Sequence, residues 1–161
     1  MKKRNYTAAM DVARYGDLKS SPGSADYELM HSLTVLRQKA RFLARNSGTM
    51  KRFIQLMQDN VVGENGFAFQ SGNSRVEAAW SAWCQSPTVD GCMSMVDFER
   101  QMVATWCRDG EYFFEVVVNR QYPDMIALNP LEADMIDEGV NTINTLTKNQ
   151  IKMGVEIDDM G

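Results

Sequence analysis

The sequence predicts an α+β fold in which helices come first and a small mixed sheet follows. Two periodicities support this prediction. In several segments between residues 26 and 108, apolar residues recur at spacings of three and four, as on one face of a helix. From residue 111 onward they alternate with other residues, as in strands. A length of 161 residues is enough for one ordinary domain with a core.

The N-terminal half is expected to hold an arm and two helices. Residues 1–23 predict an extended arm that ends in the breaker cluster 19–23 (KSSPG), and residues 24–161 then form the α+β region. A helix is expected from Asp26 to about Arg45, ending at Asn46-Ser47-Gly48. Thr49 is expected to cap a second helix, whose apolar face carries Met50, Phe53, Ile54 and Met57.

Two more helices are expected after a change of pattern. Phe67 and Phe69 alternate as in a short strand. Ser74 and Glu77 have the spacing of a capping box, which predicts the start of a third helix. A fourth helix is expected from about Ser94 to Arg108, followed by a sharp turn at Asp109-Gly110.

The C-terminal part reads as strands. Residues 111–119 predict the clearest strand, and residues 125–128 can return beside it as a hairpin. Residues 131–136 are expected to be extended or briefly helical, and residues 139–150 to form a loop. Alternation of Ile151, Met153, Val155 and Ile157 then predicts one last strand.

Charge is divided unevenly along the chain. Residues 1–60 carry 11 Lys and Arg against 5 Asp and Glu, whereas residues 61–161 carry 6 against 16, within a net charge of −4. The division indicates either a basic end that meets phosphate or a basic helical region folded against an acidic one.

One basic cluster stands out. Arg37, Arg41 and Arg45 are spaced by four and so share a helix face, and Lys51 and Arg52 follow across the turn. Such a row can contact DNA phosphates without reading sequence. The alternative is a solvated face, or salt bridges to neighbouring residues.

The sequence favours a non-enzymatic protein without cofactor or metal. It contains no GxxxxGK[ST], GxGxxG or HExxH motif. His31, Cys107 and the carboxylates Asp97, Glu99 and Asp109 are the residues that an enzymatic alternative would use. Three cysteines are too few for a disulfide framework and are read as reduced thiols. No apolar run is long enough for a membrane helix.

An ordered set of segments resembles the lambda-type portal proteins of tailed bacteriophages. Residues 36–46 (LRQKARFLARN) are similar to that family's LR-x-R-[SA]-R-x-L-x-RN helix, and residues 59–66 (DNVVGENG) to its NVVG turn. Further similar segments are 77–83 (EAAWSAW), 90–98 (DGCMSMVDF), 108–111 (RDGE) and 154–158 (GVEID). Their order and spacing over nearly the whole chain carry the resemblance.

The resemblance implies a structural subunit of a homo-oligomeric ring, usually of twelve copies, through which DNA enters and leaves the capsid. The matching part resembles the outer, wing-like region, which packs against neighbouring subunits and the capsid shell. Contacts with terminase and the tail adaptor are then expected beyond residue 161, so that the wing-like region is incomplete at its C-terminus. Contact with duplex DNA would be non-specific. The implied location is the portal vertex of the virion, and the host cytoplasm during assembly.

Two alternatives stay open beside the ring subunit. One is a stand-alone DNA-associated module that uses the basic helices, and the other is a non-functional prophage portal remnant.

Overall fold

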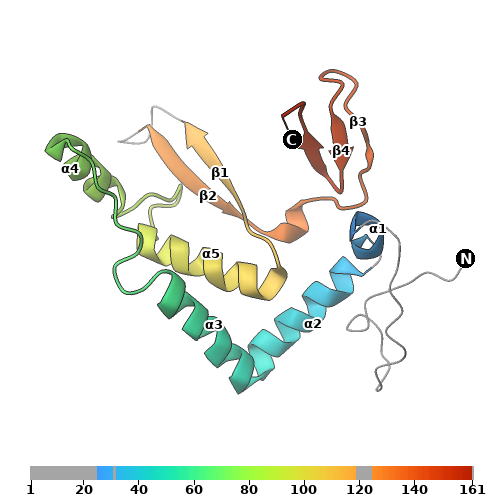
Figure 1. Cartoon of the computed structure of the whole chain (residues 1–161), viewed down its shortest axis with the longest axis horizontal. Coiled ribbons are helices and arrows are strands. Elements are labelled where there is room, and N and C mark those ends of the chain that lie inside the picture. The colour runs from blue at the N-terminus through green and yellow to red at the C-terminus, as the bar shows by residue number, and fades with distance from the viewer. Residues whose placement is uncertain (1–24, 31, 119–124, 161) are drawn as a thin grey trace, which may run out of the picture. The chain divides into compact units, whose positions relative to one another are not determined.

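The computed structural model describes residues 25–30, 32–118 and 125–160, without the side chains of residues 26 and 27 (Figure 1). The predicted arm, residues 1–23, and His31 lie outside the described residues. The chain divides into two compact units. The first contains the residues up to Phe42 together with Asp134–Gly161, and the second contains Leu43–Ala133.

The first unit contains helices α1 (Ala25–Leu29) and α2 (Leu33–Asn46), although the last turn of α2 belongs to the second unit. The 3-10 helix η2 (Ala133–Met135) leads to an antiparallel sheet with the strand order β3 (Thr142–Ile143), β4 (Gln150–Lys152) and β5 (Val155–Ile157).

Three predictions for the first unit were wrong. The expected first helix is two helices, α1 and α2, and the backbone carbonyl of Ser32, just before α2, accepts from Leu36 N. The expected last strand is a hairpin, β4 and β5, that turns at Met153 and Gly154, which have φ values of 48° and 80°. Apolar alternation continued through this two-residue turn, so the sequence pattern concealed it. The expected loop at 139–150 contains β3.

The second unit contains α3 (Gly48–Val61), α4 (Ser74–Trp83), α5 (Met95–Asp109) and a hairpin of β1 (Phe113–Val118) and β2 (Ile126–Leu131). In this unit α5 lies between α3 and the hairpin (Figure 1). The ring of Phe98 on α5 meets Tyr112 and Phe114 edge-on, at centroid distances of 5.8 and 5.7 Å. The α+β prediction is confirmed. All strand pairs of the two sheets are antiparallel. Within the described residues, the parallel component of the predicted mixed sheet is an isolated bridge between Thr88 and Leu128.

Three local predictions for the second unit were wrong. Ser47, rather than Thr49, caps α3 by accepting from Met50 N. Asn73, rather than Ser74, caps α4, and Glu77 accepts from Ser71 N instead of completing a capping box. Residues 67–70 are not a strand. Phe67 N donates to the side chain of Glu99, so this segment satisfies a backbone donor without a partner strand.

The core of the second unit is small. Its buried apolar residues include Val62, Phe98, Val103, Ala127, Leu128 and Ala133. No residue of α3 is buried, and Phe53 on its expected apolar face is 45% exposed. In the described part of the chain, we find no helix with the length and apolar character needed to span a membrane.

Candidate functional site

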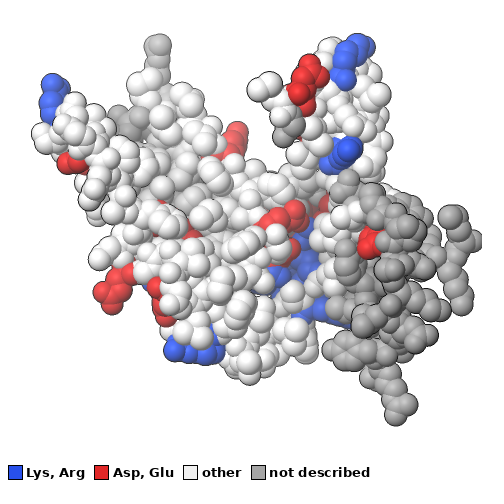
Figure 2. All heavy atoms as spheres, viewed as in Figure 1, with Lys and Arg blue, Asp and Glu red and all other residues white. Residues whose placement is uncertain are grey.

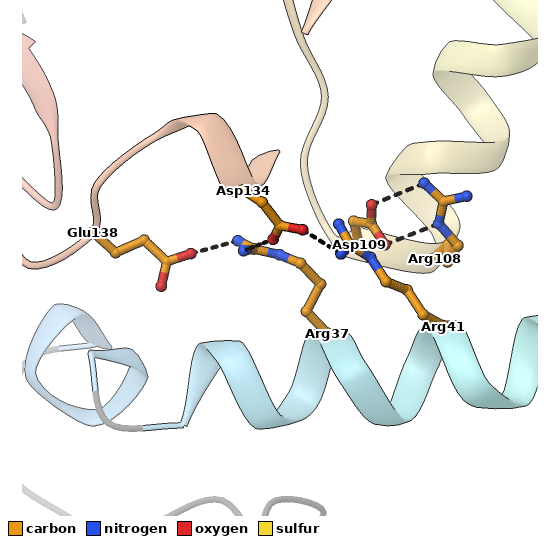
Figure 3. A network of polar contacts seen from close by, with 6 residues as sticks. All are labelled: Arg37, Arg41, Arg108, Asp109, Asp134 and Glu138. Carbon is orange, nitrogen blue, oxygen red and sulfur yellow. Dashed lines mark hydrogen bonds and ion pairs between the residues drawn. The ribbon is translucent and has the colours of Figure 1, made fainter. Parts of the chain in front are cut away.

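Two arginines of the predicted basic row belong to a network within the first unit. Arg37 and Arg41 lie one turn apart on α2 and point toward the segment that begins at η2 (Figure 3). Arg37 donates from Nη1 to Asp134 Oδ1 at 2.9 Å and from Nη2 to Glu138 Oε1 at 2.6 Å. Arg41 Nη1 donates to the other oxygen of Asp134. Asp134 therefore bridges the two arginines.

Burial differs sharply across this arginine–carboxylate network. The side chain of Arg37 is 4% exposed, that of Arg41 24% and that of Asp134 51%. The hydrogen bond from Arg41, and then that from Arg37, hold the pKa of Asp134 below its ordinary value. Both arginines are thus engaged by carboxylates of their own chain, which is the salt-bridge alternative that the sequence had left open.

The other three basic residues lie in the second unit, where α2 ends and α3 begins. Arg45, Lys51 and Arg52 are all exposed, and we call them the basic corner. Arg52 donates to Gln55 within α3, and none of the three forms an ion pair within the described residues. The predicted basic row therefore divides into two arginines that are bound by carboxylates, Arg37 and Arg41, and the three exposed cations of the basic corner.

The described residues of the enzymatic alternative, a set that leaves out His31, have structural partners or unreactive surroundings. Burial raises the pKa of the Cys107 thiol, which disfavours the nucleophilic thiolate. Asp97 forms the capping box of α5 with Ser94, and Asp109 receives two hydrogen bonds of 2.9 Å from Arg108 (Figure 3). Among the described residues, no group of three or more His, Cys, Asp and Glu side chains is placed to hold a metal ion.

Glu99 has a role that sequence reasoning missed. Its side chain is on α5, is buried, and accepts from Phe67 N at 3.1 Å. Burial raises the pKa of this carboxyl. The neighbouring residue Arg100 donates to the backbone oxygen of Gly63 at 2.7 Å and also pairs with Asp59. Glu99 and Arg100 together hold the glycine turn 63–67 against α5. In the sequence, Gly63 and Gly66 indicated that the backbone approaches another part of the protein closely. The sequence did not indicate that the group approached is the side chain of Glu99.

The second unit exposes many large apolar side chains. They lie on α3, on the segment before α4, on α5 and on the hairpin, and include Phe53, Leu56, Phe67, Phe69, Trp106, Phe114, Val116, Val118 and Ile126. On the face shown in Figure 2, charged residues occur in small groups on a largely uncharged surface. Extensive exposed apolar surface of this kind is typical of proteins that bury it against a partner.

A shallow hollow lies over the sheet of the first unit. Its lining comes from β3, β4 and the residue before β3: Asn141, Thr142, Ile143, Gln150, Ile151 and Lys152. The lining holds one ionisable side chain, Lys152, and so offers no acid–base pair.

Comparison with known proteins relates the chain to phage portal proteins. The model of the family described as phage portal protein, lambda family, matches residues 13–161. A protein of Halomonas phage phiHAP-1 described as a probable portal protein is 31% identical over 157 residues. That alignment covers 88% of this chain and 30% of the relative, so the chain spans less than a third of the length of this curated relative.

Proposed function

Since the chain belongs to the lambda family of phage portal proteins, we propose that it forms part of a structural subunit of the portal ring. DNA would be packaged into the capsid and ejected from it through this ring. The capsid shell, terminase and tail adaptor would be its protein partners, and the portal vertex of the virion its final location. Its role would be to form contacts with neighbouring subunits and partners, and not to catalyse a covalent reaction.

The observation that carries this proposal is the mismatch between core and surface in the second unit. Its buried apolar core is small, whereas large apolar side chains are exposed on each of its helices and strands. An apolar side chain contributes roughly 1.5–3 kcal/mol when it passes from full exposure to full burial, so each of these half-exposed side chains would contribute a share of that in an interface. Assembly would therefore supply stabilisation that the isolated unit lacks.

The test is the state of association of the purified protein. Light scattering coupled to size exclusion, with negative-stain microscopy of the same fractions, should show closed rings rather than a distribution of aggregates. A protein that stays monomeric at its highest soluble concentration contradicts the proposal. It would favour a stand-alone module or a portal remnant.

We also propose that the basic corner contacts duplex DNA non-specifically. Its three cations are exposed and lie between positions 45 and 52 on α2 and α3, whereas Arg37 and Arg41 are engaged by carboxylates. Cations of this kind release counterions from the DNA backbone, so binding would weaken steeply as salt rises.

A further inference from the structure

The glycine turn 63–67 contains an asparagine that is followed directly by a glycine. Asn65 is exposed, and Gly66 after it has a φ of 70°. Neither the side-chain amide of Asn65 nor the backbone N–H of Gly66 forms a hydrogen bond to another described residue. The side-chain amide and the next backbone nitrogen are therefore adjacent and open to water.

An asparagine in this setting can react with the backbone nitrogen that follows it. Once water or hydroxide has removed the proton of Gly66 N, that nitrogen attacks Cγ of Asn65 and forms a C–N bond. The bond from Cγ to Nδ2 breaks, and Nδ2 takes a proton from solvent and leaves as ammonia. Water then opens the cyclic imide at either of its carbonyl carbons, which gives aspartate or isoaspartate. Glycine has no side chain to obstruct the attack.

Hydrogen bonds from α5 hold both ends of this turn. At its start, Arg100 donates to the backbone oxygen of Gly63 at 2.7 Å. At its end, Glu99 accepts from Phe67 N at 3.1 Å. Oε2 of Glu99 also lies close to Gly66, since a Cβ on that glycine would be 2.6 Å from it. The turn therefore has two fixed ends and little room for extra backbone between them.

We infer that Asn65 is a site of spontaneous deamidation, and that its conversion to isoaspartate releases the turn from α5. In isoaspartate the main chain runs through Cβ and Cγ, so the backbone gains one carbon and roughly 1.5 Å of length. The hydrogen bond from Phe67 N to Glu99 is the one that breaks, because Arg100 is held a second time by Asp59. This site is independent of the proposed ring assembly.

Asn73 is a matched control within the same molecule. It is also exposed and precedes a small residue, Ser74. Its side chain, however, accepts from Arg75 N at 3.0 Å, and Ser74 is the first residue of α4. The side chain of Asn73 must leave this cap before it can react. Asn65 should therefore be converted several times faster than Asn73.

The first experiment follows both asparagines while the folded protein is incubated at mildly alkaline pH. Peptide mapping by mass spectrometry, with enzymatic labelling of isoaspartate, should place most of the product at residue 65. The variant Asn65→Gln should give no product there, because its longer side chain would have to close a larger ring. Absence of product at residue 65, or formation no faster than at residue 73, overturns the inference.

The second experiment measures amide hydrogen exchange at Phe67 in the unmodified and isoaspartate forms, separated by ion exchange. Exchange should be roughly 2–10-fold faster in the isoaspartate form, as expected for the loss of one hydrogen bond. The variant Asn65→Asp has the new charge on an unaltered backbone, so its exchange at Phe67 should stay near the wild-type rate. Equal exchange in the isoaspartate and unmodified forms would contradict release of the turn.

Discussion

Arg37 and Asp134 are 97 residues apart in the sequence, and Nη1 of the arginine lies 2.9 Å from Oδ1 of the aspartate. Arg41 binds the other oxygen of the same carboxylate. Within the first unit, this network fastens α2 to the segment that leads into the β3–β4–β5 sheet. It also separates Arg37 and Arg41, which stabilise the fold, from the exposed cations of the basic corner.

Arg37 should matter more for stability than Arg41. Arg37→Met is expected to lower the free energy of unfolding by about 2–3 kcal/mol, because it leaves Glu138 and Asp134 without a buried partner. This is below the usual loss for a fully buried pair, since Asp134 is half-exposed. Arg41→Met should cost less than about 1 kcal/mol. Urea denaturation of both variants measures the difference, and equal losses would contradict the role of burial.

Glu99 should make stability depend on pH. Burial raises the pKa of its carboxyl in the folded protein, so the folded state holds the proton more tightly than the unfolded state. This contribution to stability is fully present below the ordinary pKa of a glutamate, and it is lost as pH rises through the raised pKa. Glu99→Gln stays neutral throughout. The free energy of unfolding of the variant, relative to wild type, should therefore increase with pH across that window in denaturation curves recorded at several pH values. A constant difference would count against this account.

Gly66 should tolerate a side chain less well than Gly63. Both have positive φ, 70° and 74°, so alanine at either position incurs a similar backbone cost of about 1–2 kcal/mol. A Cβ at Gly66 would also lie 2.6 Å from Oε2 of Glu99, whereas a Cβ at Gly63 would have nothing within 4 Å. Gly66→Ala should therefore lower the melting temperature more than its control Gly63→Ala. Equal melting temperatures would show that the glycine turn does not press on Glu99.

Asn73, and not Ser74, should stabilise α4. The side chain of Asn73 accepts from Arg75 N at 3.0 Å. Asn73→Ala is expected to cost about 1 kcal/mol in the free energy of unfolding. Ser74→Ala should be nearly neutral, because Ser74 is the first residue of the helix rather than its cap. Thermal unfolding of the two variants distinguishes them, and the reverse order would restore the capping box that the sequence suggested.

Duplex DNA binding should depend on the basic corner. Replacing Arg45, Lys51 and Arg52 with alanine should weaken binding to all sequences alike. It should also reduce the slope of log affinity against log salt by about 2–3, near 0.9 for each phosphate that the protein no longer neutralises. Fluorescence anisotropy at low and moderate salt measures both quantities. Affinity that is unchanged at both salt concentrations would remove the basic corner from the DNA-binding proposal. Arg41→Met is the control, because Arg41 is bound by the carboxylate of Asp134. For this variant, the slope of log affinity against log salt should stay at the wild-type value.

The sequence determined the elements whose signals are local. Periodicity located α4, α5 and the β1–β2 hairpin, and Asn46-Ser47-Gly48 marked the end of α2, because a helix face, a strand face and a chain reversal are each set by neighbouring residues. The order of motifs along residues 36–158 also pointed to the portal family that the comparisons then showed.

The tertiary structure decided which partner each polar group takes. Arg37 binds Asp134 and Glu138, Phe67 N binds Glu99, and the turn at Met153-Gly154 folds one alternating run into two strands. These outcomes depend on groups far apart in the chain, or on a backbone conformation that an apolar pattern does not encode. A charged or polar side chain is equally compatible with solvent and with a distant partner, and burial selects between the two only once the chain has folded.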